Sequence, residues 1–480
     1  MKAQAIKRLF SDQVVLGGIS SSLEVSAALI EITDGKISSI IKCSRSELDP
    51  NLDIEDVGSS IISPAFVNSH THLCMLAFRG IGGLSALSNN VVKDLYFQLE
   101  ENLLPEDVLH FTRIAALEAL MTGVGAVWEH YYFGDSLVQG LEDVGLCGAI
   151  ASTLQDLSGP GKNHTQRAID ETLKLASDAS KTEKGLVAVL GPHATDTVSD
   201  TLWSQIGEIA TEHQLPIHSH LAQALDEVEW SWKNHSCSPM ERMHRLGLTT
   251  LDVPRLWVHG LFISKEDLRS ANPQLDHLAH CPSAQMQFGF PAHVNSWRTR
   301  DFKIVLGTDS ASCNDGINIQ SELRFFGAAD SYAVTMGDTL RKFRKEGSLS
   351  RAKQVQEERQ LIFDMRAPYV SPEKLLASVW GNAGDLHPQL PVGAIEIGRL
   401  GNILVWDSKH PCLWPNWDPL QGLAFNHATP ALLRIMLRGE WLFDGEGYLA
   451  SRIMQDSRIH EWQAEASLSW KKLLTRANLS

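Results

Sequence analysis

"LPIHSHLAQALDE" (residues 215–227) joins a short apolar run to two histidines and a following helical pattern. Successive side chains of a β-strand point to opposite faces, so His218 and His220 lie on the same side. Gln223 lies three residues beyond His220, and these two side chains meet only where the strand turns into a helix. A strand that ends in polar residues and leads directly into a helix is typical of α/β folds, whose sites lie at strand ends.

The same arrangement recurs from residue 61 to about 390. Short apolar runs alternate there with helical patterns, which indicates parallel strands joined by crossover helices. Eight runs are expected to form strands: 60–67, 124–128, 146–152, 185–190, 215–219, 255–259, 275–279 and 302–307. Eight such strands predict an α/β protein built on a TIM (β/α)8 barrel, with the active site at the carboxyl ends of the strands.

The two chain ends differ from the middle. Residues 1–60 and 392–448 contain short β-type runs separated by Gly, Asp and Ser turn signals. We therefore expect a small β-domain at the ends, the barrel over 61–391, and a helical C-terminal tail over 449–480. A charged, helical insertion at about 331–370 either covers the barrel or forms an oligomer contact, and the sequence leaves both interpretations open.

Composition indicates a small-molecule enzyme of the cytoplasm. The net charge of -15 argues against a nucleic-acid surface, which needs a basic stripe. The seven cysteines are scattered without a C-x-x-C pair, a pattern typical of reduced thiols. No segment approaches the roughly 20 apolar residues of a membrane span, so no membrane association is expected.

"VNSHTHL" (residues 67–73) is the sharpest local motif. Two histidines at i and i+2 at a strand end point the same way, so both imidazoles can bind one ion. An H-x-H pair alone is often coincidental, but three further metal-compatible side chains follow the fifth, sixth and eighth strands: His220, His259 and Asp309. In a barrel these strand ends converge, which predicts one polar, metal-binding pocket.

Six stretches together resemble the amidohydrolase superfamily: "ISPAFVNSHTHL", "GPHATDT", "IHSHLAQ", "WVHG", "LAHCPSAQMQFGF" and "GTDSASCND". The resemblance is to its mononuclear aminohydrolases, which include adenosine-type, guanine and methylthioadenosine/S-adenosylhomocysteine deaminases and triazine hydrolases. It implies a β-sandwich built from both chain termini and a homo-oligomer, dimeric or larger. No lysine follows the fourth strand, where binuclear relatives carry a bridging one, so one metal ion per chain is expected.

The resemblance also implies roles for single residues. It makes His70, His72, His220 and Asp309 the metal ligands, with Zn²⁺ as the expected ion and Fe²⁺ as the alternative. Asp309 would move a proton from a metal-activated water to the leaving group, and His259 would hydrogen-bond that water. Six side chains would contact substrate: Trp128, Glu129, His130, His193, His280 and Asn314. A structural role for His193, His259 or His280 stays open.

Gln223 departs from this family pattern. Relatives of the deaminase type carry glutamate there, which protonates a ring nitrogen of the substrate. Glutamine donates an amide N–H but has no ionisable proton, and losing a general acid costs about 10² to 10⁴ in rate. Asp226 and Glu227 lie one helical turn further on and are not expected to replace it. A second departure places Ala284 and Gln285 where relatives have Ser-Asn.

The sequence therefore predicts a metal-dependent hydrolase of C–N bonds, of the deaminase type, acting on an N-heterocyclic small molecule with Gln223 among its catalytic residues. Two alternatives remain. One is a hydrolase of amide, urea or carbamate bonds, for which Gln223 is natural because no ring needs a proton. The other is an impaired or engineered Glu→Gln form that binds its substrate without turning it over.

Overall fold

The computed structural model describes residues 6–80, 92–288, 294–366 and 370–478. Eight strands pair in chain order, every pair parallel. They are β6 (Phe66–Thr71), β7 (Val124–Tyr131), β8 (Cys147–Leu154), β9 (Leu186–Pro192), β10 (Ile217–Leu221), β11 (Arg255–His259), β12 (Asp276–His280) and β13 (Ile304–Leu306). A parallel bridge between Thr71 and Asp309 joins the segment after the last strand to the first strand. The predicted TIM barrel is confirmed.

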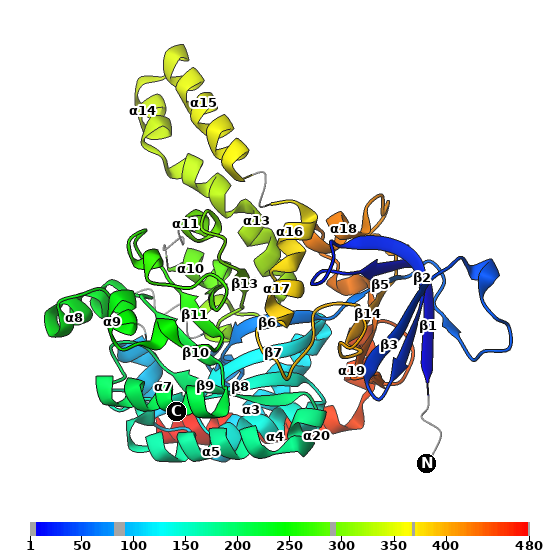
Figure 1. The fold of residues 1–480 in the computed structure, drawn as a ribbon, viewed down its shortest axis with the longest axis horizontal. Coiled ribbons are helices and arrows are strands. Elements are labelled where there is room, and N and C mark those ends of the chain that lie inside the picture. The colour runs from blue at the N-terminus through cyan, green and yellow to red at the C-terminus, as the bar shows by residue number, and fades with distance from the viewer. Residues whose placement is uncertain (1–5, 81–91, 289–293, 367–369, 479–480) are drawn as a thin grey trace.

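Helices surround this barrel, as Figure 1 shows. Two of them begin with clear start signals: Ser199 caps α7 by accepting from the Leu202 amide, and Pro105 opens α3. Those on the barrel are α2 (Phe97–Glu100), α3 (Pro105–Met121), α4 (Gly134–Val144), α5 (Thr165–Ser177), α6 (Ala179–Glu183), α7 (Asp200–His213), α8 (Leu225–His235), α9 (Pro239–Arg245), α10 (Pro282–Gln287), α11 (Val294–Arg298), α12 (Ala311–Asn314), α16 (Pro372–Ala377) and α17 (Gly381–Gly384).

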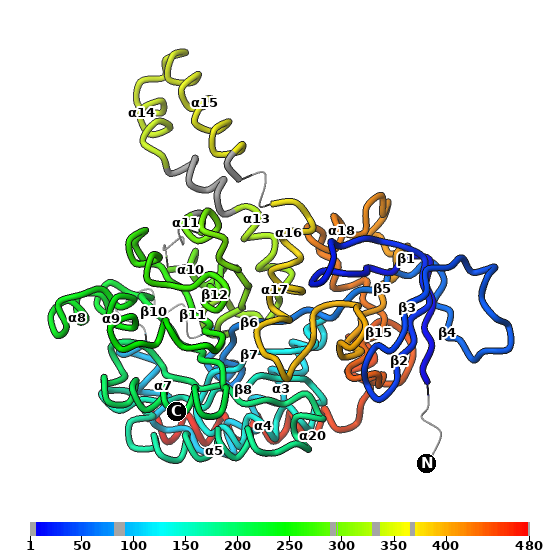
Figure 2. Tube along the Cα trace, in the orientation of Figure 1, coloured from blue at the N-terminus to red at the C-terminus, as the bar shows by residue number. Residues whose placement is uncertain are grey.

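The expected β-domain from both chain termini is also present. Its mostly antiparallel sheet runs β16-β15-β14-β5-β1-β2-β3, with β4 beside β1. The strands are β1 (Lys7–Leu16), β2 (Glu24–Thr33), β3 (Lys36–Lys42), β4 (Glu55–Asp56), β5 (Ile61–Pro64), β14 (Ile403–Trp406), β15 (Leu432–Leu437) and β16 (Glu440–Leu442). Figure 2 shows both chain ends contributing to it beside the barrel.

The apolar run 60–67 does not form one strand, as the sequence predicted, but two. Ile61–Pro64 pairs with β14 in the terminal sheet, and Phe66–Thr71 is the first barrel strand. The change occurs at Ala65, whose amide donates to Asn402 O, while the next amide donates to Gly123 O. Continuous apolar character could not reveal this switch, because both segments are fully buried.

The predicted insertion lies in three helices, α13 (Ile319–Met336), α14 (Asp338–Glu346) and α15 (Leu349–Arg366). Figure 1 shows α14 and α15 projecting away from the barrel as an arm. The remaining helices are α18 (Pro419–Phe425), α19 (Leu449–Gln455) and α20 (Ser457–Arg476), and α20 packs against α3. Among the described residues, no helix has the length and apolar character needed to cross a bilayer.

Candidate metal centre and active site

The closure of the barrel builds one wall of the site. The Asp309 amide donates to His70 O at 3.1 Å, and the Thr71 hydroxyl donates to Asp309 O at 3.1 Å. Gly307 permits this approach, since a Cβ there would lie 2.6 Å from His70 O. The H-x-H motif of the first strand and the aspartate after the last strand are therefore held together by backbone contacts.

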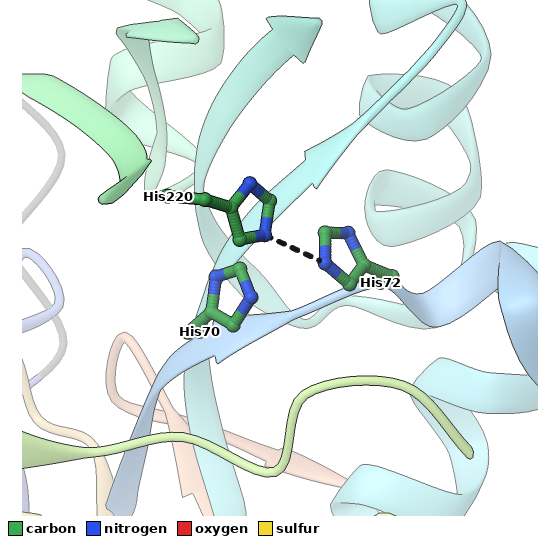
Figure 3. A group of neighbouring side chains, drawn as sticks. All are labelled: His70, His72 and His220. Atoms are coloured by element: carbon green, nitrogen blue, oxygen red, sulfur yellow. Dashed lines mark hydrogen bonds between the residues drawn. The ribbon is translucent and has the colours of Figure 1, made fainter. Parts of the chain in front are cut away.

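The imidazoles of His70, His72 and His220 converge on one point (Figure 3). His72 Nδ1 lies 2.5 Å from His130 O, and His220 Nδ1 lies 2.7 Å from His193 O. A carbonyl only accepts, so both Nδ1 atoms carry the proton. Burial lowers the pKa of His72 to about 3 and of His220 to about 4, so both rings are neutral at pH 7.

Two lone pairs consequently face each other. His72 Nε2 and His220 Nε2 lie 3.3 Å apart, and neither holds a proton, so the dashed line in Figure 3 joins two acceptors. His70 Nε2 is buried, and no described residue hydrogen-bonds to it. Two acceptor nitrogens this close repel unless a cation lies between them, and His70 offers a third ring nitrogen within 4.8 Å of both. This arrangement fits a metal ion.

The Asp309 carboxylate completes the donor set. Its Oδ1 lies 3.5 Å from His72 Nε2 and 3.8 Å from His70 Nε2. Ligands about 2.0–2.1 Å from one zinc ion lie about 3.3 Å apart in a tetrahedron, close to these spacings. Burial raises the pKa of Asp309 to about 7, against the lowering effect of the Ser310 amide. A nearby cation would favour its carboxylate form.

His218 contacts His70, an interaction that the sequence motif did not reveal. Its Nε2 lies 2.9 Å from His70 Nδ1. One of these two nitrogens carries the shared proton, and a cation at His70 Nε2 requires it to be on His70 Nδ1. Both histidines of "IHSH" point into the barrel, as strand alternation predicted, but only His220 reaches the centre.

Three of these strand ends carry a residue with strained backbone. Ala222, His259 and Asp309 have φ values of 50°, 71° and 57°, in the left-handed region that non-glycine residues rarely adopt. Each such residue costs on the order of 1–3 kcal/mol and persists only where its surroundings fix it. These three positions lie at or just beyond the ends of the fifth, sixth and eighth strands, where the predicted site lies.

A cavity of about 490 Å³ is lined by three of the four candidate metal-ligand side chains, His72, His220 and Asp309. Volumes of about 300–1,000 Å³ are typical of small-molecule sites. The structure brings together seven of the predicted residues in its lining: His72, His130, His193, His220, Gln223, His259 and Asp309. His193 Nδ1 lies 3.1 Å from the Thr197 hydroxyl, and neither ring nitrogen of His130 has a partner among the described residues.

Four residues predicted to contact substrate lie outside that lining. Both oxygens of Glu129 accept from the Leu73 amide at 3.0 Å, which fixes the turn after His72. Asn314 donates to the Ser283 hydroxyl and to Thr308 O. The other two are packed against aromatic rings: Trp128 against His218 and His280 against Phe326. Their substrate roles stay predictions.

Glu227 holds the corner that carries Gln223. Its carboxylate accepts from the Ala222 amide at 3.0 Å, from the Gln223 amide at 2.8 Å, and from the Thr195 hydroxyl. Although burial raises the pKa of Glu227 to about 7, three donors occupy its oxygens. Glu227 therefore positions Gln223, and the geometry does not present it as a substitute proton donor. Asp226 is exposed and lies 3.6 Å from Lys93.

Several residues of the lining carried no sequence signal. Lys93, Tyr96 and Glu100 come from the segment between the first strand and α3. Lys93 forms an ion pair with Asp196 at 2.7 Å, and burial raises the pKa of Glu100 to about 7. They follow no apolar run of the barrel, so strand-end reasoning could not identify them.

A (β/α)8 barrel with imidazoles and a carboxylate converging at its strand ends defines the class of metal-dependent barrel hydrolases. Comparison with known proteins agrees: the pattern of the amidohydrolase family matches residues 61–442. The protein belongs to the amidohydrolase family. The hydrolase predicted from the sequence is confirmed, and the family is metal-dependent.

Similar proteins include deaminases and a triazine-degrading enzyme. The 5'-deoxyadenosine deaminase of Methanopyrus kandleri is 24% identical over 434 residues, covering 89% of this chain and 92% of its own. An adenosine deaminase from Xanthomonas campestris with bound zinc superposes with a TM-score of 0.77 at 18% identity, covering 98% of each chain. Atrazine chlorohydrolase from Arthrobacter aurescens, complexed with zinc, gives 0.73 at 16% identity, covering 96% of this chain and 100% of that chain.

Proposed function

We propose that the protein hydrolyses a C–N bond of an N-heterocyclic small molecule, as a metal-dependent enzyme of the deaminase type. The observation that carries this proposal is the pair of unprotonated nitrogens, His72 Nε2 and His220 Nε2, 3.3 Å apart at the base of a ligand-sized cavity. The names of the relatives support the substrate class, since each acts on a purine derivative or a triazine.

We further propose one Zn²⁺ per chain, with Fe²⁺ as the alternative, held by His70, His72, His220 and Asp309. The mixture of imidazole and carboxylate donors suits both ions. When bound, such an ion polarises the substrate and lowers the pKa of a water molecule towards neutrality. Zinc in two of the solved relatives supports the choice.

Asp309 and His259 are the proposed catalytic side chains. Asp309 Oδ2 lies 3.9 Å from His259 Nε2, so both groups can reach one reacting oxygen placed between them. Asp309 accepts a proton from the attacking water and passes it to the leaving nitrogen. His259 donates a hydrogen bond to the oxygen that attacks the substrate carbon.

Gln223 donates an amide hydrogen bond from the cavity wall and supplies no proton. A substrate whose ring is already electron-poor reacts without ring protonation. The same residue favours a second candidate, hydrolysis of an amide, urea or carbamate, where a polarised carbonyl suffices. His130 and His193 are the proposed substrate contacts, because both line the cavity.

The test is a substrate screen with zinc-loaded and metal-stripped protein. Purines, pyrimidines and triazines are assayed for ammonia or amine release, beside aryl amides and ureas. Metal-dependent release from a heterocycle supports the proposal. Cleavage of amides or ureas alone supports the second candidate, and binding without turnover by fully loaded protein contradicts both.

We also propose a cytoplasmic homo-oligomer. Apolar side chains on the projecting arm support association, since Leu349 is 74% and Leu361 is 60% exposed. Light scattering coupled to size exclusion tests it, and a mass of one chain at micromolar concentration would contradict it.

A further inference from the structure

Gln285 is a buried amide at the base of the cavity, in α10 after β12. Its side chain is 3% exposed and lines the cavity. Its Nε2 lies 3.4 Å from His259 Nδ1. The sequence showed only that Gln285 differs from the usual residue of the family, and the structure places it against a proposed catalytic histidine.

The contact with Gln285 distinguishes His259 from the proposed metal ligands His72 and His220 by the partner that its Nδ1 faces. His72 and His220 direct Nδ1 at backbone carbonyls, which only accept, so their Nε2 atoms are free to bind a cation. His259 directs Nδ1 at an amide nitrogen, which only donates. A neutral ring whose Nδ1 accepts must carry its proton on Nε2.

A second contact agrees with this proton position. The Asp309 Oδ2 acceptor lies 3.9 Å from His259 Nε2, and a bare Nε2 there would place two acceptors against each other. Gln285 Oε1 is buried and has no hydrogen-bond partner among the described residues, so the amide nitrogen carries the contact with His259.

We propose that Gln285 is a positioning residue that selects the His259 tautomer, so that His259 presents an N–H to the reaction centre and stays out of the metal-ligand set. His259 and Asp309 otherwise form a second possible ligand group with His70. The amide decides between these arrangements. This inference rests on the proposed metal-dependent reaction for its consequence, but the tautomer itself is independent of turnover.

The experiment compares the wild type with Gln285→Glu, Gln285→Asn and Gln287→Glu, all loaded with zinc. Glutamate only accepts, so in Gln285→Glu the His259 proton moves to Nδ1. Gln287→Glu adds the same charge two residues away, at an exposed position of the cavity lining. Side-chain ¹⁵N NMR of labelled histidine reads the tautomer, with His259→Asn identifying the signal.

We expect Nε2–H in the wild type and in Gln287→Glu, and Nδ1–H in Gln285→Glu. Loss of the donor should lower kcat by about 10² to 10³, the usual cost of removing one such hydrogen bond, with KM changed much less. Gln285→Asn is expected to restore part of kcat if the amide still reaches His259.

Nδ1–H on His259 in the wild type would overturn the proposal, even if Gln285→Glu failed to fold. An unchanged tautomer in folded Gln285→Glu would overturn it as well. Wild-type Nε2–H that moves in Gln285→Glu, in a protein that hydrolyses no substrate, would uphold the tautomer and reject the proposed function instead.

Discussion

Gln223→Glu should convert a hydrogen-bond donor into a proton donor at the cavity wall. The two side chains have nearly the same shape, and the backbone N–H of Gln223 donates to Glu227 Oε2 at 2.8 Å. The substitution keeps this backbone contact, so the backbone should not move. The new carboxyl would lie beside buried Glu227. Burial and a like charge both raise a carboxyl pKa, so the new group should hold a proton near neutral pH.

The expected increase in rate follows from what a general acid contributes to catalysis. Such a group contributes about 10² to 10⁴ in rate, or about 3 to 5 kcal/mol of transition-state stabilisation. We therefore expect kcat/KM for ammonia or amine release from a purine or triazine to rise at pH 7 by at least about 10². Metal content should stay unchanged, because Gln223 is not among the ligands.

The assay is steady-state turnover of zinc-loaded protein, and Gln287→Glu is the matched control. That variant adds a carboxyl to the same cavity but away from the corner, so a comparable rise there would show that added charge, and not a proton donor at the corner, raises the rate. Equal rates for the wild type and Gln223→Glu on every heterocycle would refute the reasoning. Ring protonation would then not limit the reaction, and the amide or urea substrates would be favoured.

Three further predictions concern construction of the barrel. Gly307→Ala would place a Cβ 2.6 Å from His70 O, so it should lower the free energy of unfolding by about 1–3 kcal/mol and weaken metal binding. The control Gly316→Ala, where an added Cβ meets no atom within 4 Å, should change neither quantity. Urea unfolding and metal titration measure the two effects. Arg255→Met leaves Asp276 buried without its ion-pair partner at 2.6 Å and should lower the unfolding free energy by about 3–5 kcal/mol, and a loss below 1 kcal/mol would contradict it. Burial lowers the pKa of His277 and of His387 from 6.5 to about 4. As pH falls, the unfolded chain therefore binds protons at these histidines before the folded chain does. The folded state should lose stability between about pH 6.5 and pH 4, relative to its stability above pH 7. Each should cost about 2 kcal/mol at pH 5, and His387→Gln should abolish its share of the acid loss in pH-dependent urea unfolding.

Strand periodicity explains why the metal centre could be found from sequence. Alternation along β6 and β10 requires His70 and His220 to face the barrel interior, and parallel pairing places their ends at one rim. Asp309 follows the eighth strand, which closes against the first. Local sequence and global fold therefore specify the same point, and the barrel and its ligand cluster could be predicted together.

The rest of the cavity depends on contacts that no local pattern encodes. Glu129 lies beside His130 near the end of β7, yet its carboxylate accepts from the Leu73 amide, because a buried carboxylate needs donors. Lys93 reaches the cavity from the segment before α3, where it forms an ion pair with Asp196. These two residues lie 103 positions apart in the sequence. Buried Glu227 accepts hydrogen bonds from three donors, and these donors surround its carboxylate only after the corner has formed.

The central claim is a single cation bound by His70, His72, His220 and Asp309, and metal content by mass spectrometry tests it most directly. Wild type and His259→Asn, grown with zinc, should each contain close to one equivalent of transition metal per chain, and His72→Asn should contain almost none. A full equivalent in folded His72→Asn, or none in the wild type, would contradict the account.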